Sequence, residues 1–412
     1  MDIRAYNPGK DKQAVLRIYR ELDWLKNEKK EEQAIDWFFR CSKVNIHDVN
    51  GSAECVIAII PARVQYSNDS KNNLRFSAIA SMATSLIIRQ RRIAGKLLAY
   101  SIAEDVQKGA QVAGLCMFEQ GFYDRLGFGT GSYENRVCFD PANLNISIKP
   151  RIPVRITDKD WKQAHECTLN RKTFHGGVNL LPSLITRVRM AFTKNGFGFG
   201  YKEKGRITHY MWIQTDNIES GPYNIQWMSY NTGEQFLELL ALIKSWGDQI
   251  RLVEIEEPVH IQFQDFLCKP FYYSQITEKA KYENKITAAA YWQMRICLLQ
   301  DCITAVKTGG VGVEFNLRLY DPIKEYLPQD SKWQGCSGDY VVKFGSESVI
   351  RPGKKNSLPV LEASIGAFTR MWLGVRPASG LAISDNLKAP DSLLEGLDIV
   401  FLLPRPSPDC DY

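Results

Sequence analysis

The sequence lacks any long hydrophobic run. No apolar stretch approaches the ~18 residues that a membrane-spanning helix needs, so a membrane protein is not indicated. The first residues, Met-Asp-Ile-Arg-Ala-Tyr-Asn-Pro, lack the apolar segment of a secretory signal peptide. We therefore expect a cytoplasmic protein with no membrane partner.

Metal-ligand patterns are also missing. The chain has 10 cysteines, but no two form a Cys-x-x-Cys pair, and its 5 histidines are dispersed. Most of the cysteines lie inside apolar segments, where buried free thiols are common. We expect reduced thiols and no bound metal.

The excess of positive charge is small. The 52 basic and 46 acidic residues give a net charge of +6, and the basic residues are scattered rather than run together. Nucleic-acid binding needs a concentrated basic surface, so no nucleic-acid partner is expected. With 44% hydrophobic and 24% charged residues, the composition is that of an ordinary globular protein.

Segment order predicts three blocks, because 412 residues are too many for one core. Two helices open the first block, followed by an antiparallel hairpin of residues 53–66 and 74–85, then a strand, loop, helix and strand. This is an α+β order. A proline-rich passage at 148–155 precedes a second block of similar order, and a charged segment at 278–285 precedes the third, where we expect a helix over 358–371.

The stretch from Ile79 to Leu98 reads as a strand, a short basic turn and the start of a helix. Arg89, Arg91 and Arg92 lie in the turn, and the small residues Ala94 and Gly95 follow. Free N–H groups and the helix dipole both favour an anion at a helix start. The stretch therefore predicts a site that holds a phosphate group.

The turn itself, Arg89-Gln-Arg-Arg92-Ile-Ala94, resembles the Q/R-x-x-G-x-G/A pattern of GNAT N-acetyltransferases at its first and last places. Leu97 and Leu98 fall where those enzymes have paired leucines. Arg92 occupies the place of the first glycine, which allows the closest approach of backbone to a pyrophosphate. We expect its side chain to point away from the backbone of the turn. Standing alone, a short basic turn is more often a solvated loop.

A second motif lies downstream, in Phe118-Glu-Gln-Gly-Phe-Tyr-Asp-Arg-Leu-Gly-Phe128. It resembles the second half of the GNAT pattern, carried by Phe122, Tyr123, Leu126, Gly127 and Phe128. One interpretation makes Tyr123 a core aromatic on a short helix. The other makes it the general acid that protonates the departing thiolate of coenzyme A, since a phenol with a pKa near ~10 stays protonated at neutral pH.

The order of the three blocks resembles the layout of the enhanced intracellular survival (Eis) family of GNAT enzymes. The second block has Ser229-Tyr-Asn-Thr-Gly-Glu234 where a basic turn would be, which predicts one active site per chain. The segment Ala367-Phe-Thr-Arg-Met-Trp-Leu-Gly374 looks like part of the family's sterol-carrier-protein-like domain. The resemblance implies a GNAT domain at 1–145, a second GNAT-like domain at 146–283 and a carrier-like α+β domain at 284–412.

The resemblance also implies the residues that bind acetyl-CoA. The pantetheine arm would pair with backbone groups of Met82, Ala83 and Thr84. The pyrophosphate would be held by the turn, which comprises Gln90, Arg91, Arg92, Ile93, Ala94 and Gly95. The acetyl group would be lined by Phe118 and Glu119.

The resemblance implies, finally, a base and an acceptor. The family uses its C-terminal carboxylate as the base, which corresponds here to Tyr412. An aminoglycoside, a polyamine or a lysine-like amine would be the acceptor, and the assembly a homo-hexamer. Asp23, Trp24 and Trp37 offer a carboxylate and two aromatic rings that would suit a pocket for a cationic amine. The alternative interpretation is structural: both tryptophans belong to the core, and Asp23 is a residue at the end of a helix.

A rival interpretation is a non-catalytic binding protein. In that case the third block would carry a lipid or another ligand, and the GNAT-like blocks would be scaffolding. Arg92 in place of glycine favours this rival, whereas the intact Tyr123 favours the enzyme.

Overall fold

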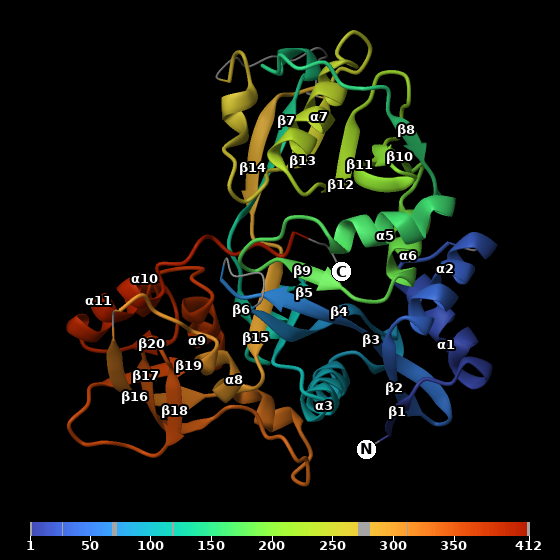
Figure 1. Cartoon of the computed structure of the whole chain (residues 1–412). Coiled ribbons are helices and arrows are strands. Elements are labelled where there is room, and N and C mark those ends of the chain that lie inside the picture. Colours follow the sequence, from blue (N-terminus) through green and yellow to red (C-terminus); the bar gives the residue numbers. More distant parts are fainter. Residues whose placement is uncertain are drawn as a thin grey trace.

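The computed structural model describes residues 2–26, 28–67, 72–117, 119–270, 281–310 and 312–409. Within these ranges the chain forms three sheets with helices packed against them, so the α+β class is confirmed. Figure 1 shows the first sheet at the centre of the molecule, between the second sheet and the third. Each sheet is mostly antiparallel and contains one parallel pair, β4–β5, β12–β13 and β16–β19 respectively.

The first sheet has the order β1-β2-β3-β4-β5-β15-β6, with β9 paired to β3 outside this path. Its strands are β1 (Ile3–Ala5), β2 (Lys43–Val49), β3 (Ser52–Gln65), β4 (Asn73–Thr84), β5 (Val112–Cys116), β6 (Gly129–Thr130), β9 (Val178–Leu180) and β15 (Trp292–Ile296). β3 and β4 form the long hairpin that the sequence predicts.

The two faces of this sheet have separate cores, because side chains alternate along each strand. Val56 and Ala58 of β3 join the core that α1 (Pro8–Glu21) and α2 (Lys29–Arg40) cover. Cys55 and Ile57 join the core beneath α3 (Ile93–Gln107) and α4 (Gln120–Asp124). The sheet thus separates an α1–α2 face from an α3–α4 face.

The second sheet has the order β14-β7-β13-β12-β11-β10-β8. Its strands are β7 (Glu134–Phe139), β8 (Val154–Ile156), β10 (Phe197–Glu203), β11 (Arg206–Gln214), β12 (Tyr223–Ser229), β13 (Val253–Glu256) and β14 (Lys285–Ala289). Helix α7 (Gly233–Lys244) connects the parallel strands β12 and β13, just as α3 connects β4 and β5. α5 (Trp161–Leu169) and α6 (Leu184–Phe192) lie between this sheet and α2 (Figure 1).

The third sheet has the order β18-β17-β16-β19-β20. Its strands are β16 (Val313–Tyr320), β17 (Gly338–Phe344), β18 (Val349–Pro352), β19 (Val360–Ser364) and β20 (Leu387–Lys388). The helices of this part are α8 (Leu299–Thr304), α9 (Ile365–Trp372), α10 (Ala378–Ser384) and α11 (Asp391–Val400). Short 3₁₀ turns elsewhere are η1 (Leu86–Ile88), η2 (Pro141–Asn143), η3 (Asp158–Asp160), η4 (Phe263–Phe266) and η5 (Pro322–Tyr326).

One predicted helix is wrong in its first half. Residues 358–371 divide into strand β19 and helix α9. Residues 360–364 form a strand because they pair in parallel with β16. Burial therefore alternates along β19, with Leu361 and Ala363 inside and Glu362 outside. Ser364 then caps α9 by accepting a hydrogen bond from the backbone of Ala367 at 3.1 Å.

The helices are short. The longest, α3, has 15 residues, and no helix in the described ranges has the length and hydrophobicity to cross a membrane.

The sheets exchange strands across the predicted domain limits. β7 follows the first sheet in sequence but pairs with β13 and β14 of the second. β15 lies beyond residue 284, yet it inserts between β5 and β6 of the first sheet. The domain limits stay a prediction, and the three parts are physically interlocked.

His175 is buried and hydrogen-bonds to segments of the first and third parts of the chain. The backbone N–H of Ser67 donates to its Nδ1 at 2.8 Å, so the ring proton lies on Nε2, which donates to the carbonyl of Leu373 at 2.9 Å. The backbone of Ser407 donates to the His175 carbonyl at 3.1 Å. Burial lowers the pKa of His175 to about 4, which keeps the ring neutral.

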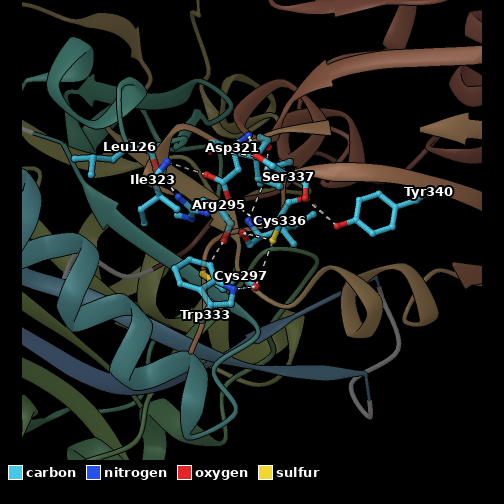
Figure 2. Close-up of polar contacts among 12 residues, drawn as sticks. Leu126, Arg295, Cys297, Asp321, Ile323, Trp333, Cys336, Ser337 and Tyr340 are labelled. Atoms are coloured by element: carbon cyan, nitrogen blue, oxygen red, sulfur yellow. Dashed lines mark hydrogen bonds and ion pairs between the residues drawn. The ribbon is translucent and has the colours of Figure 1, made fainter. Parts of the chain in front are cut away.

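A buried ion pair links the first and third sheets (Figure 2). Nη2 of Arg295, in β15, donates to Oδ2 of Asp321 at 2.6 Å, and both side chains are fully buried. Nη1 of Arg295 donates to the carbonyl of Leu126. The backbone N–H groups of Ile323 and Cys336 donate to the same carboxylate at 3.1 and 2.9 Å. These hydrogen bonds offset the desolvation of both charges.

We expect Arg295→Met to lower the free energy of unfolding by about 3–5 kcal/mol, because it leaves the Asp321 carboxylate buried and unpaired. The double variant Arg295→Met/Asp321→Leu should lose less than Arg295→Met alone. Arg318→Met, at an exposed ion pair with Glu362, is the control and should change stability by less than about 1 kcal/mol. Denaturant unfolding measures all three, and a double variant weaker than both singles would contradict the assignment.

Candidate active site

Strands β4 and β5 separate in the middle of the first sheet. Their parallel pairing ends at Ile79 and Leu115, and no later pair joins them in the described residues. At the same level the pairing of β4 with β3 skips Ala80, which forms a bulge. A bulge bends and twists its strand, so the end of β4 turns away from β5 and leaves an opening in the sheet.

The three predicted pantetheine-binding residues lie on β4 beside this opening. Met82, Ala83 and Thr84 remain paired with β3 on one side. On the other side, where β5 has diverged, no strand of the described chain covers them. Met82 packs on the α3–α4 face and Ala83 on the α1–α2 face, so this segment borders both faces of the sheet.

The basic turn leads directly into α3. Arg89, Arg91 and Arg92 are exposed, and none of them forms an ion pair with another described residue. Arg92 is the N-cap residue of α3 and its side chain makes no capping hydrogen bond. The first N–H groups of an α-helix have no partner within it, so they are available to an anion here.

The backbone of Arg92 explains how this chain departs from the family pattern. Its φ of 59° and ψ of 10° are left-handed, the conformation that glycine adopts without strain. The backbone at this position thus has a conformation that glycine would adopt without strain, although the residue is arginine. The Arg92 side chain is exposed, and the expectation that it points away from the turn stays a prediction.

The equivalent helix of the second sheet, α7, begins with a side-chain cap. Thr232 Oγ1 accepts a hydrogen bond from the backbone of Gln235 at 3.3 Å, and Gln235 Oε1 accepts from the backbone of Thr232 at 3.3 Å. This capping box satisfies the N–H groups of Thr232 and Gln235, whereas α3 has no side-chain cap. Glu234 also places a negative charge in the first turn. Both features agree with one active site per chain.

Tyr123 lies on α4, on the same face of the sheet as α3. Tyr123 is 8% exposed, and its ring packs edge-on against Phe122, with centroids 4.9 Å apart, and against Phe128 at 6.1 Å. Burial, and then the nearby Glu119 carboxylate, raises the pKa of Tyr123 to about 12. The phenol therefore keeps its proton at neutral pH.

Two residues near Tyr123 in the sequence, Glu119 and Gly127, also stabilise the local structure. The Glu119 carboxylate caps α4, accepting from the backbone of Gly121 at 3.1 Å and of Phe122 at 2.6 Å. Gly127 has a φ of 79°, and a Cβ built on it would meet Ile365 of α9 at 2.5 Å. Phe118 lies outside the described residues.

A cavity of about 440 Å³ lies on the α1–α2 face, on the opposite side of the sheet from Tyr123. It reaches β4 at Ala80 and Ser81, and the Ser81 hydroxyl is 2.9 Å from the hydroxyl of Tyr19. α6 and the strands β11 and β12 supply its far wall, so the second sheet completes it. We call this the α1–α2 cavity.

The structure brings one of the three predicted acceptor residues to the α1–α2 cavity. Trp24 lines it and stacks on Tyr19, with ring centroids 5.6 Å apart. Asp23 is exposed at the end of α1 and is not among the lining residues. Trp37 lies under the guanidinium of Arg187, 3.8 Å from its ring centre, between α2 and α6.

The final described residues approach this region from the third sheet. The Pro408 carbonyl accepts from the backbone of Val178 at 2.8 Å, and the Asp409 carboxylate accepts from Nε of Arg171 at 2.8 Å. A small hollow of about 80 Å³ beside Asp409 shares Arg189 and Trp227 with the α1–α2 cavity. Tyr412, the predicted base, lies outside the described residues.

Sequence reasoning identified Trp24 alone among the lining residues of the α1–α2 cavity; those it missed include Tyr19, Ser81, Arg189 and Trp227. Helical spacing marks Tyr19 only as a core position. Arg189 and Trp227 belong to the second block, and no local pattern connects them with the first.

Comparisons with known proteins place the fold. The sequence matches no protein-family model and no curated protein. Among solved structures, a probable N-acyltransferase from Enterococcus faecalis V583 superposes with a TM-score of 0.79 at 14% identity, covering 98% of this chain and 97% of that one. A GCN5-related N-acetyltransferase from Kribbella flavida gives 0.72 at 15% identity, covering 100% and 98%. Eis1 from Mycobacterium abscessus gives 0.75 at 13% identity, covering 100% of both chains.

These similarities extend over the whole chain, so the predicted resemblance to Eis and to GCN5-related N-acetyltransferases is confirmed at the level of the fold.

The left-handed backbone of Arg92 leads to a stability prediction. Arg92→Gly should leave the free energy of unfolding unchanged or raise it by up to about 1 kcal/mol, because glycine relieves the strain of a positive φ. Arg91→Gly is the matched control: Arg91 is not among the residues with positive φ, so this variant should lose about 0.4–1 kcal/mol. Equal losses in denaturant unfolding would argue against the strained conformation.

Proposed function

We propose that this protein is an N-acetyltransferase that moves an acetyl group from acetyl-CoA to a primary amine. The observation that carries the proposal is the opening between β4 and β5, with the uncapped, basic start of α3 on one face and a cavity on the other. The fold shared with GCN5-related N-acetyltransferases supports the same reaction.

The donor would lie on the α3–α4 face. The N–H groups of Ile93, Ala94 and Gly95, with the exposed guanidinium groups of Arg91 and Arg92, are suited to the pyrophosphate. The uncovered edge of β4 offers backbone groups to the amide-containing pantetheine arm. The thioester would then lie in the opening, within reach of both faces.

The proposed chemistry is direct transfer in a ternary complex. The free amine attacks the acyl carbon, an N–C bond forms, and the C–S bond breaks with its electron pair on sulfur. Tyr123 gives its phenolic proton to that thiolate. Its raised pKa of about 12 ensures that the proton is present throughout the neutral range.

A base must also remove a proton from the acceptor, because an amine that is protonated in solution becomes a nucleophile only after it loses that proton. We retain the Tyr412 carboxylate as the proposed base, acting through water. The tail supports this role because Asp409 already lies against Arg171, beside the hollow next to the α1–α2 cavity. Three further residues can span up to ~10 Å.

We expect Tyr123→Phe to lower kcat by about 10²–10⁴-fold, with the Kd for acetyl-CoA changed less than about twofold, since the phenyl ring preserves packing. Because the pKa of Tyr123 is about 12, the wild-type rate should not fall through loss of this proton between pH 7 and 10. Thiol release measures kcat, and calorimetry measures binding. Tyr133→Phe, at an exposed tyrosine, is the control. Full turnover by Tyr123→Phe would remove it from the mechanism.

Deleting residues 411–412 should reduce kcat about 10²-fold or more while the affinity for acetyl-CoA stays the same, because the proposed base is lost and the donor site is intact. The matched control extends the tail by one glycine, which keeps every residue and moves the terminal carboxylate. Unchanged turnover in both variants would exclude the Tyr412 carboxylate as the base.

A further inference from the structure

We infer that Arg171 is a positioning residue for the reaction: it fixes the chain at Asp409 and thereby sets where the terminal carboxylate lies. This inference depends on the proposed function, because it takes the Tyr412 carboxylate as the base. It rests on contacts between the chain just after α5 and the last described residues, which no motif in the sequence describes.

The Arg171 guanidinium is buried between α5 and β9. The residue is 7% exposed. Its Nη1 donates to the carbonyl of Thr168, in α5, at 2.9 Å and to Oδ1 of Asn179, in β9, at 2.5 Å. Its Nη2 donates to the carbonyl of Val178 at 2.9 Å. Since the guanidinium is planar, these hydrogen bonds also fix the directions of its other N–H groups.

The other N–H groups bind one residue of the C-terminal tail. Nε donates to Oδ2 of Asp409 at 2.8 Å, and Nη2 donates to the Asp409 carbonyl at 3.3 Å. Hydrogen bonds between a guanidinium and a carboxylate are stronger than neutral ones and add geometric specificity. Arg171 therefore restrains both the side chain and the backbone of Asp409.

The tail before Asp409 is held by other contacts. The backbone N–H of Ser407 donates to the carbonyl of His175 at 3.1 Å, and the N–H of Val178 donates to the carbonyl of Pro408 at 2.8 Å. Ser407 and Pro408 are buried, whereas Asp409 is exposed. Arg171 thus acts at the point where the tail emerges from the interior.

The backbone of Asp409 turns at this point. Its φ of 51° is left-handed, a conformation that a residue other than glycine keeps only where its surroundings hold it. The Asp409 carbonyl accepts from Arg171, and the Asp409 N–H donates to Oγ of Ser407 at 3.3 Å. Both peptide groups that flank the Asp409 Cα are therefore restrained. Because this turn sets the direction of the chain after it, Arg171 determines how the three following residues leave.

This direction matters because Arg171 and Asp409 lie next to the α1–α2 cavity. Both border the small hollow that shares Arg189 and Trp227 with that cavity. A base must come within hydrogen-bond reach of the acceptor, directly or through one water. A chain end that is not tied down samples many positions. Restraint at Asp409 therefore increases the time that the proposed base spends within reach.

Asp409 is the residue to vary. Its side chain is 46% exposed, so its loss should cost little stability, whereas loss of Arg171 would also release α5 from β9. Asp409→Gly keeps the left-handed backbone accessible and removes the carboxylate. Asp409→Asn tolerates the same φ and retains an oxygen that accepts from Arg171, so it is the matched control.

The first measurement is hydrogen–deuterium exchange of the C-terminal peptide in the full-length protein, which needs no turnover. We expect exchange to be roughly tenfold faster or more in Asp409→Gly, and within about threefold of the wild-type rate in Asp409→Asn. Equal exchange in Asp409→Gly and the wild type would overturn the inference, even if deletion of residues 411–412 abolishes turnover as the proposed base requires.

The second measurement is kcat for thiol release from acetyl-CoA, with spermidine or an aminoglycoside as acceptor, whichever reacts faster. Asp409→Gly should lower kcat about tenfold or more and Asp409→Asn less than about threefold, with the Kd for acetyl-CoA unchanged in both. In a chain that lacks residues 411–412, Asp409→Gly should lower kcat no further, because the base that it positions is absent.

Equal losses from Asp409→Gly in the intact and the shortened chain would show a merely structural effect and overturn the inference. Full turnover by the shortened chain would instead contradict the proposed base and, with it, the catalytic part of the inference. The exchange rates would then still decide whether Arg171 fixes the tail.

Discussion

The Arg295 guanidinium joins three segments that are far apart in the chain. It pairs with Asp321, which directly follows β16, the middle strand of the third sheet, and it donates to the carbonyl of Leu126, three residues after Tyr123. Since both charges are fully buried, neither can move away from the other at low cost. The position of Tyr123, which we propose to act at the donor site, therefore depends on the third sheet as well as on the first.

The first sheet then works as a partition between two chemical environments. Its α3–α4 face has exposed arginines and open N–H groups, which suit a phosphorylated donor. Its α1–α2 face has an aromatic cavity whose far wall comes from the second sheet. The bulge at Ala80 and the divergence of β5 connect the two environments at one place. The second sheet repeats the parallel pair but caps its helix at Thr232, and it contributes a wall of the cavity.

The parts predictable from sequence are those in which the cause is local. The hairpin, the basic turn and the helix of Tyr123 follow from periodicity and motif spacing, and the structure contains all three. Prediction was incomplete where the local structure depends on residues that are distant in the sequence. The helix over 358–371 was wrong in part because pairing with β16 draws Val360–Ser364 into a sheet. The left-handed state of Arg92 was not predictable, since its side chain gives no sign of it. No local sequence pattern predicts that Arg189 lines the cavity or that Arg295 and Asp321 form an ion pair.

The insertion of β15 has a consequence for how the protein is made. Between Cys116, the end of β5, and Trp292, the start of β15, more than 170 residues must be synthesised. At the usual rates of translation this takes about 10–35 s. Throughout that interval the edge of β5 that β15 later covers is unpaired, and its residues are almost entirely apolar. The nascent first sheet is thus a client for chaperones and a template for wrong strand pairing. A chain shortened before residue 292 would keep both motifs and still lack the strand that closes their sheet.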